Sequence, residues 1–218
     1  MIQTSVRRVL VVGSTGLVGR EVVRLALADQ GVAAVTTWVR RAPVTAPASA
    51  RLSSTVVDFD ALDAASAGFD ADQVFLAVGT TIRKAGSQDA FRAVDFDLPL
   101  RVARIARAHG ARHVLLVSAL GASAASRVFY NRVKGELEDA IDALGFRSFT
   151  IARPSLLLGD REELRLGELI AKPFASFLPA SVAGVYASQV AAALVTAARD
   201  DAPGKRVIDN RELRTFPR

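Results

Sequence analysis

The chain has 218 residues, half of them apolar and only 6% aromatic, and it carries a formal net charge of +6. It contains no cysteine and two histidines, which excludes disulfides and thiolate ligands, so no metal site is expected. No apolar run reaches the roughly 18 to 20 residues that span a bilayer, and residues 1–8 lack the apolar core of a secretory signal. We therefore expect a cytoplasmic protein without a membrane span.

The positive charge is mostly arginine, and the arginines are spread along the chain instead of forming one basic run. Net charge alone reports only loosely on the partner of a protein. Nucleic acid is therefore not the expected partner, and a phosphorylated small molecule fits the scattered arginines better.

Short apolar runs alternate with longer helical patterns along the chain. Strands are predicted at about 9–12, 33–39, 55–57, 73–78, 113–117, 146–152 and 206–208, with residues 45–54 as a loop. Helices are predicted at about 17–28, 88–109 (irregular near Pro99), 127–144, 162–177 and 187–199. This alternation predicts an α/β fold, a Rossmann-type doubly wound parallel sheet in one domain over residues 1–218, with a small C-terminal lid at about 155–185.

A glycine-rich turn follows the first strand and begins the first helix. Gly13 allows the tight turn, Gly16 leaves room for a diphosphate, and Gly19 lets the helix pack closely on the strand. The free amides at the helix start would hold the phosphates. The predicted contacts are Gly13, Ser14, Thr15, Gly16, Leu17, Val18 and Gly19. The alternative is a glycine loop that only tightens the connection.

The end of the second strand indicates which dinucleotide is bound. NAD-specific sites place a carboxylate there, whereas this chain has Arg40 and Arg41, which suit the 2′-phosphate of NADPH. NADPH is thus expected in preference to NADH, unless both arginines are merely solvated. Asp58, after the third strand, could accept a hydrogen bond from the adenine amino group.

Ser118, Tyr130 and Lys134 are the predicted catalytic residues. Tyr130 and Lys134 are four residues apart on a helix and share a face, and Ser118 ends the preceding strand. A tyrosine is a weak acid at neutral pH, but the Lys134 ammonium and the positive charge of the oxidised nicotinamide would lower its pKa and make it a general acid–base for carbonyl reduction. Ser118 would orient the carbonyl, and Lys134 would also hold the nicotinamide ribose. Such a Tyr–Lys pair also occurs on solvated helix surfaces without any role.

Five motifs together resemble the atypical short-chain dehydrogenase/reductase superfamily, and more narrowly its Tat-interactive protein 2-like NAD(P)H-binding branch. They cover residues 13–19, 57–59, 79–86, 130–136 and 153–159, and the run from Gly79 to Gly86 is the most specific. The resemblance implies that Phe59, Gly79, Thr80 and Pro154 contact the cofactor, the last beside the nicotinamide. Many superfamily members have an asparagine in a proton relay where this chain has Asp95, so the resemblance does not carry that relay over.

Substrate contacts are expected from Thr81 and from the late lid segment, where Phe174 and Phe177 would form an apolar wall. The same phenylalanines could equally pack the core. The first hypothesis is an NADPH-dependent reductase of a small or moderately apolar carbonyl compound. The second is a catalytically silent NADPH-binding regulator or redox sensor that acts through a protein partner, and isomerisation or dehydration with a tightly held cofactor is a third.

Overall fold

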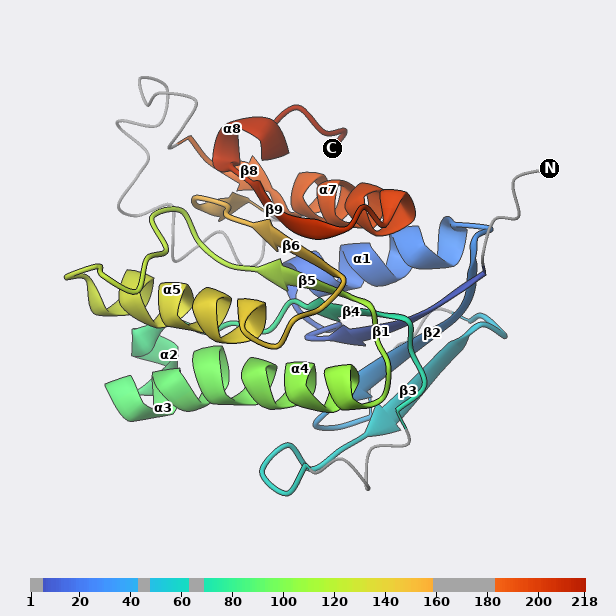
Figure 1. Ribbon diagram of the computed structural model, residues 1–218, viewed down its shortest axis with the longest axis horizontal. Helices are drawn as coiled ribbons and strands as arrows, with labels where there is room; N and C mark the ends of the chain where they lie inside the picture. The colour runs from blue at the N-terminus through green and yellow to red at the C-terminus, as the bar shows by residue number, and fades with distance from the viewer. Residues whose placement is uncertain (1–5, 43–47, 63–68, 159–182) are drawn as a thin grey trace.

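The computed structural model describes residues 6–42, 48–62, 69–158 and 183–218. In these residues strands and helices alternate along the chain, and the strands form one seven-stranded and one two-stranded sheet (Figure 1). The large sheet contains β1 (Arg7–Val12), β2 (Val32–Val39), β3 (Leu52–Val56), β4 (Gln73–Leu76), β5 (His113–Val117), β6 (Ser148–Ala152) and β9 (Gly204–Ile208). The small sheet pairs β7 (Leu157–Leu158) with β8 (Val185–Tyr186). The helices are α1 (Leu17–Ala28), α2 (Ile82–Ala85), α3 (Gln88–Arg92), the π-helical turn η1 (Ala93–Asp97), α4 (Leu98–Ala108), α5 (Phe129–Asp142), α7 (Ala187–Asp200) and α8 (Asn210–Leu213).

The large sheet is parallel throughout, in the order β3-β2-β1-β4-β5-β6-β9. The chain runs outward from β1 to β3 and then returns to the other side of β1 with β4. The strand order therefore reverses between β1 and β4. Doubly wound sheets bind ligands at the carboxyl ends of their strands at such a reversal. The predicted Rossmann-type fold is confirmed, and its switch point lies beside the glycine-rich turn.

Each face of the sheet is covered by a layer of helices. α1 and α7 lie together on one face, and α4 and α5 lie on the other (Figure 1). The alternation of β1 explains both layers, because Val9 and Val11 join the core under α1 and α7, whereas Leu10 and Val12 join the core under α4 and α5. A strand buried on both faces needs apolar residues at every position, which is why β1 reads as a continuous apolar run.

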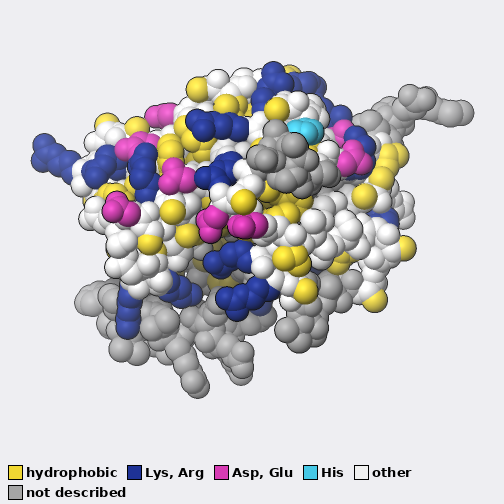
Figure 2. All heavy atoms as spheres, turned by 90° about the horizontal axis from the view of Figure 1, so that it is seen from below, with side chains coloured by type: hydrophobic (Ala, Val, Ile, Leu, Met, Phe, Trp, Pro, Cys, Tyr) yellow, Lys and Arg dark blue, Asp and Glu magenta, His cyan; other side chains and the backbone are white. Residues whose placement is uncertain are grey.

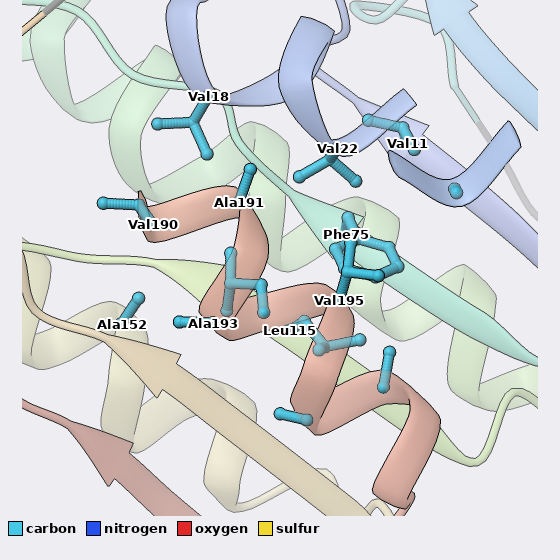
Figure 3. Packing of buried hydrophobic residues seen from close by; sticks show 14 of the residues in the cluster. Val11, Val18, Val22, Phe75, Leu115, Ala152, Val190, Ala191, Ala193 and Val195 are labelled. Carbon is cyan, nitrogen blue, oxygen red and sulfur yellow. The ribbon is translucent and has the colours of Figure 1, made fainter. Parts of the chain in front are cut away.

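Figure 3 shows the core beneath α1 and α7. Val18 and Val22 of α1 lie close to Ala191 of α7, and the ring of Phe75 from β4 fills the space below. Alanine dominates α7 because short side chains let the two helices and the sheet approach closely. This packing holds the start of α1, and with it the glycine-rich turn, against β1.

Two elements differ from the sequence prediction. β3 begins at Leu52, inside the expected loop, because it is an edge strand whose residues from Ser53 to Val56 are exposed and leave no apolar pattern. The single helix expected over 88–109 is α3, η1 and α4 in succession. The irregularity expected near Pro99 is present as η1, which ends two residues before the proline, and Pro99 itself lies in the first turn of α4.

Most of the predicted lid, including the helix expected at 162–177, lies outside the described residues. Its described ends form the small sheet of β7 and β8. None of the described helices is long and apolar enough to cross a membrane.

Candidate functional site

The glycines of the turn after β1 are fixed by close backbone contacts. Gly13 has a φ of +91°, and a Cβ there would lie 2.5 Å from the Ala77 carbonyl oxygen. A Cβ at Gly19 would lie 2.0 Å from the Gly13 carbonyl oxygen, so α1 can pack this closely only through glycine. A Cβ at Gly16 would meet nothing closer than 3.4 Å, and no side chain caps α1. The turn therefore presents bare backbone and helix-start amides, the arrangement that binds a phosphate anion.

Two adjoining cavities extend from this turn along the carboxyl ends of β1, β2, β3 and β4. The first, of about 580 Å³, is lined by the turn, the ends of β2 and β4, and parts of α2 and α4. The second, of about 840 Å³, lies between the end of β3 and α4. The two share Arg40, Phe59, Val94 and Leu98. The glycine-rich turn lines the first cavity only, and the second cavity continues from it past Arg40 and Phe59.

Most predicted cofactor residues meet in these cavities. The first is lined by Gly13, Ser14, Thr15, Gly16, Arg40, Phe59, Gly79 and Thr80, and the second adds Asp58. The side chain of Val18 lies in the core under α1, and that of Leu17 packs against this core. Only the backbone of these two residues is therefore part of the glycine-rich turn. Arg41 is exposed and lines neither cavity. Of the two predicted 2′-phosphate ligands, only Arg40 is therefore positioned at the site.

Lys84 is a lining residue that the sequence analysis did not assign. It lies on α2 and lines the first cavity together with the glycine-rich turn. Thr81, predicted as a substrate contact, caps α2 by accepting a hydrogen bond from the Lys84 amide at 3.1 Å. The motif from Gly79 to Gly86 contains both residues, so this motif could have indicated Lys84 as a residue of the site.

The predicted catalytic helix α5 is held tightly against the loop that follows β5. A Cβ at Gly135 would lie 2.1 Å from the Ser123 carbonyl carbon, so only glycine permits this approach. Tyr130, Lys134 and Glu138 follow one another at four-residue spacing on the side of α5 that faces the protein. Lys134 and Glu138 are buried, and Tyr130 is half-buried against Phe91 at a ring distance of 5.4 Å.

Lys134 forms a buried ion pair with Asp95. Its Nζ lies 2.7 Å from Asp95 Oδ1, although the angle falls outside that of a good hydrogen bond, and neither residue is more than 3% exposed. The other carboxylate oxygen, Oδ2, accepts a hydrogen bond from the Thr80 amide at 2.8 Å. Asp95 lies in η1, and π-helical turns of this kind are frequent at functional sites. The pair joins α5 to the end of β4 beside the first cavity.

The pKa of Tyr130 is raised above its usual value, contrary to the sequence prediction. Burial of the ring is the largest cause, since it disfavours the phenolate. The Lys134 ammonium acts in the predicted direction and lowers the pKa, but the Asp95 carboxylate opposes it. The sequence analysis considered the ammonium without its counter-ion, which only the fold reveals.

Ser118 is not turned toward Tyr130. Its hydroxyl donates to Glu138, which also accepts two hydrogen bonds from Arg153. A serine hydroxyl has a single proton, so while this bond is made it cannot donate to a substrate carbonyl. Pro154 is buried, and its carbonyl accepts from the Leu120 amide at 2.7 Å. Phe174 and Phe177 lie outside the described residues.

Comparison of the sequence with known proteins shows the family, and comparison of the structure shows the fold. Residues 13–201 match the model of the NAD(P)H-binding family. The chain is 38% identical to FMP52 of Candida albicans over 74% of this chain and 72% of that protein. It is 37% identical to HTATIP2 of Rattus norvegicus over 84% of this chain and 76% of that protein. The structure of MoeE5 in complex with UDP-glucose and NAD superposes with a TM-score of 0.71 at 17% identity, covering 92% of this chain and 75% of that one.

These relatives also correct one expectation. Several of the fungal relatives, including that of Candida albicans, are named as mitochondrial proteins, which contradicts the predicted cytoplasmic location. The prediction rested on the absence of a secretory signal and a membrane span, and neither absence distinguishes one internal compartment from another.

The sequence likeness is substantial over most of the chain, and the fold likeness agrees with it. The glycine-rich turn lies at the point where the strand order reverses, which is where doubly wound folds bind their ligands. The chain therefore belongs to the NAD(P)H-binding family, in the atypical short-chain dehydrogenase/reductase-like branch of HTATIP2 and FMP52.

Proposed function

We propose that this protein is an NADPH-dependent reductase of a small or moderately apolar carbonyl compound, with Tyr130 as the general acid. One observation carries the proposal: the end of β4 touches both the cofactor cavity and the catalytic helix. Thr80 lines the cavity and donates its amide to Asp95, the counter-ion of Lys134. A Cβ at Gly79 would lie 3.9 Å from Lys134 Nζ. The Tyr130–Lys134 pair is thus adjacent to the place where a dinucleotide would lie.

The residues present fit a dinucleotide. The turn from Gly13 to Gly16 would hold the diphosphate, and Lys84 lines the same cavity. Arg40 would pair with a 2′-phosphate and Asp58 would accept from the adenine amino group. The preference for NADPH rests on Arg40 and on the absence of a carboxylate at the end of β2.

When bound, the reduced dinucleotide supplies the hydride that goes to the carbonyl carbon. The chain's own part is the proton, which Tyr130 donates to the carbonyl oxygen. Tyr130 is a protonated phenol at neutral pH, which is the form that can give the proton that reduction requires, and burial makes it a weaker acid than a free tyrosine. Lys134 would hold the nicotinamide ribose and stabilise the phenolate left behind.

The test uses the two tyrosines of the chain as a matched pair. NADPH oxidation by the purified protein is screened against aldehydes, ketones and quinones, and Tyr130→Phe is compared with Tyr186→Phe on any active compound. General acid catalysis contributes roughly 10²- to 10⁴-fold, so Tyr130→Phe should lose about that factor in turnover and keep its affinity for NADPH. Tyr186→Phe should behave as the unsubstituted protein.

Turnover that survives Tyr130→Phe would refute the proposed acid. Tight NADPH binding with no oxidation of any compound would favour the second hypothesis, a regulator or redox sensor that uses the dinucleotide without turnover.

A further inference from the structure

We infer that Asp95 is a positioning residue that opposes the charge of Lys134 and thereby keeps Tyr130 a neutral phenol to higher pH, so that the phenolate needed to oxidise an alcohol forms only at higher pH. The inference rests on the proposed function for its meaning in catalysis, but the electrostatic claim can be tested without any substrate. The step concerned moves the Tyr130 proton to the carbonyl oxygen while the carbon receives the hydride, which yields an alcohol and a phenolate. Oxidation of an alcohol would instead need the phenolate at the start.

The geometry of Asp95 leaves it little other use. It is completely buried, and its two oxygens are directed to two different elements. Oδ2 accepts from the Thr80 amide at 2.8 Å, and Oδ1 lies 2.7 Å from Lys134 Nζ. A Cβ at Gly79 would lie 3.5 Å from Oδ1, so the end of β4 covers the carboxylate. A buried charge is costly unless it is paired, and here each of the two charges pairs with the other.

Within the described part of the chain, two charges act on Tyr130. Lys134, four residues along α5, favours the phenolate, and Asp95, on the facing turn η1, disfavours it. Phe91 of α3 packs against the ring and is uncharged. Burial of the ring acts in the same direction as Asp95. Among the described residues, Lys134 and Asp95 are thus the charges that decide the protonation of Tyr130.

A lysine without a counter-ion would make Tyr130 more acidic, the arrangement that the sequence motif alone suggests. Asp95 opposes that effect, because an ion pair acts on a neighbour as a dipole and not as a full positive charge, and burial of the ring adds the larger part of the rise in the pKa of Tyr130. The same carboxylate holds the Thr80 amide, so the proton donor and the edge of the dinucleotide cavity share one anchor.

The experiment follows the two tyrosines by NMR with a ¹³Cζ label while the pH is raised. Tyr130→Phe assigns the signals. Asp95→Asn keeps the size of the side chain and an oxygen for the Thr80 amide but removes the charge. An opposite charge within a few ångströms shifts a pKa by about 1 to 3, so the pKa of Tyr130 should fall by about that much in Asp95→Asn. Asp89→Asn, an exposed carboxylate on α3, removes the same charge and should leave both tyrosines unchanged.

The double variant Asp95→Asn, Lys134→Gln replaces the ion pair by a neutral amide pair and covers the case in which the single variant does not fold. Its Tyr130 should titrate close to the value in the unsubstituted protein, as expected if the pair acts as a neutral unit. A pKa of Tyr130 that is the same or higher in Asp95→Asn, or a double variant with a strongly lowered pKa, would overturn the inference.

The pH profile of turnover separates this inference from the proposed function. If the reductase is active, the rate of reduction by Asp95→Asn should decline at a lower pH than that of the unsubstituted protein. If no carbonyl compound is reduced while the titrations behave as described, the proposed function fails and the electrostatic role of Asp95 stands. A role confined to stability would lower the unfolding free energy of Asp95→Asn and move neither the titration nor the profile.

Discussion

Gly19→Ala should destabilise the protein although alanine is the better helix former. Gly19 lies in the first turn of α1, where replacing glycine in a helix by alanine normally stabilises by up to about 1 kcal/mol. The added Cβ, however, would lie 2.0 Å from the Gly13 carbonyl oxygen and 2.9 Å from Ser14 Cα. Because such contacts are not made below about 3.0 Å, α1 or the turn must move by at least about 1 Å.

That movement separates α1 from β1 and disturbs the contact between α1 and α7. Overpacking of this kind costs about 1 to 3 kcal/mol, and here the obstacle is rigid backbone, so we expect the upper part of that range. For a domain of this size a loss of about 2 to 3 kcal/mol should lower the midpoint of thermal unfolding by about 4 to 12 °C. Urea unfolding and a thermal scan measure both quantities.

Gly16→Ser is the matched control at the same turn. Its Cβ would meet nothing closer than 3.4 Å, its φ of −81° suits any residue, and serine is a favoured helix cap. Stability should therefore stay close to that of the unsubstituted protein, while the side chain obstructs the diphosphate and weakens NADPH binding in calorimetry. A Gly19→Ala protein that is as stable as the unsubstituted one, or more so, would refute the close-packing argument.

Three further predictions test the site and the fold. Arg40→Ala should weaken NADPH binding by roughly 10- to 150-fold, because a charge-assisted contact contributes about 1.5 to 3 kcal/mol, and it should weaken NADH binding far less. Arg41→Ala should change neither affinity. Equal losses of affinity for both dinucleotides would exclude the 2′-phosphate role. His113 is buried with its pKa lowered to about 4, so it is neutral in the folded protein. Its contribution to stability is therefore lost as the pH falls from about 6.5 toward 4, and the free energy of unfolding should drop by about 2 kcal/mol between pH 7 and 5. His113→Gln should remove that part of the pH dependence. Ser118→Ala should cost about 1.5 to 3 kcal/mol of stability by removing the hydrogen bond to Glu138, and a loss of turnover at unchanged stability would instead assign the hydroxyl to the substrate.

Positive and negative side chains are interspersed on the face of the molecule that Figure 2 shows. Figure 2, which views the molecule from below Figure 1, shows Lys and Arg side chains scattered over this face with Asp and Glu between them. Arg101 is an example of a positive charge used internally, since it donates to the Phe59 and Asp60 carbonyls and so holds the loop that borders the second cavity.

The sequence by itself determined the order of strands and helices and the position of the dinucleotide turn. Both are local properties: apolar runs such as β1 follow from burial on both faces, and Gly13, Gly16 and Gly19 lie within seven residues of one another. It failed at β3, an exposed edge strand, and it predicted an irregularity near Pro99 without identifying it as the π-helical turn η1 at Ala93–Asp97.

Only the tertiary structure decided how the charges are paired. It set Asp95 against Lys134 and Glu138 against Ser118, although Asp95 and Lys134 are 39 residues apart in the chain. It also separated Arg40 from its neighbour Arg41, because adjacent residues leaving a strand point in different directions and only one reaches the cavity. The protonation of Tyr130 depends on such long-range neighbours and on burial, neither of which a sequence motif contains.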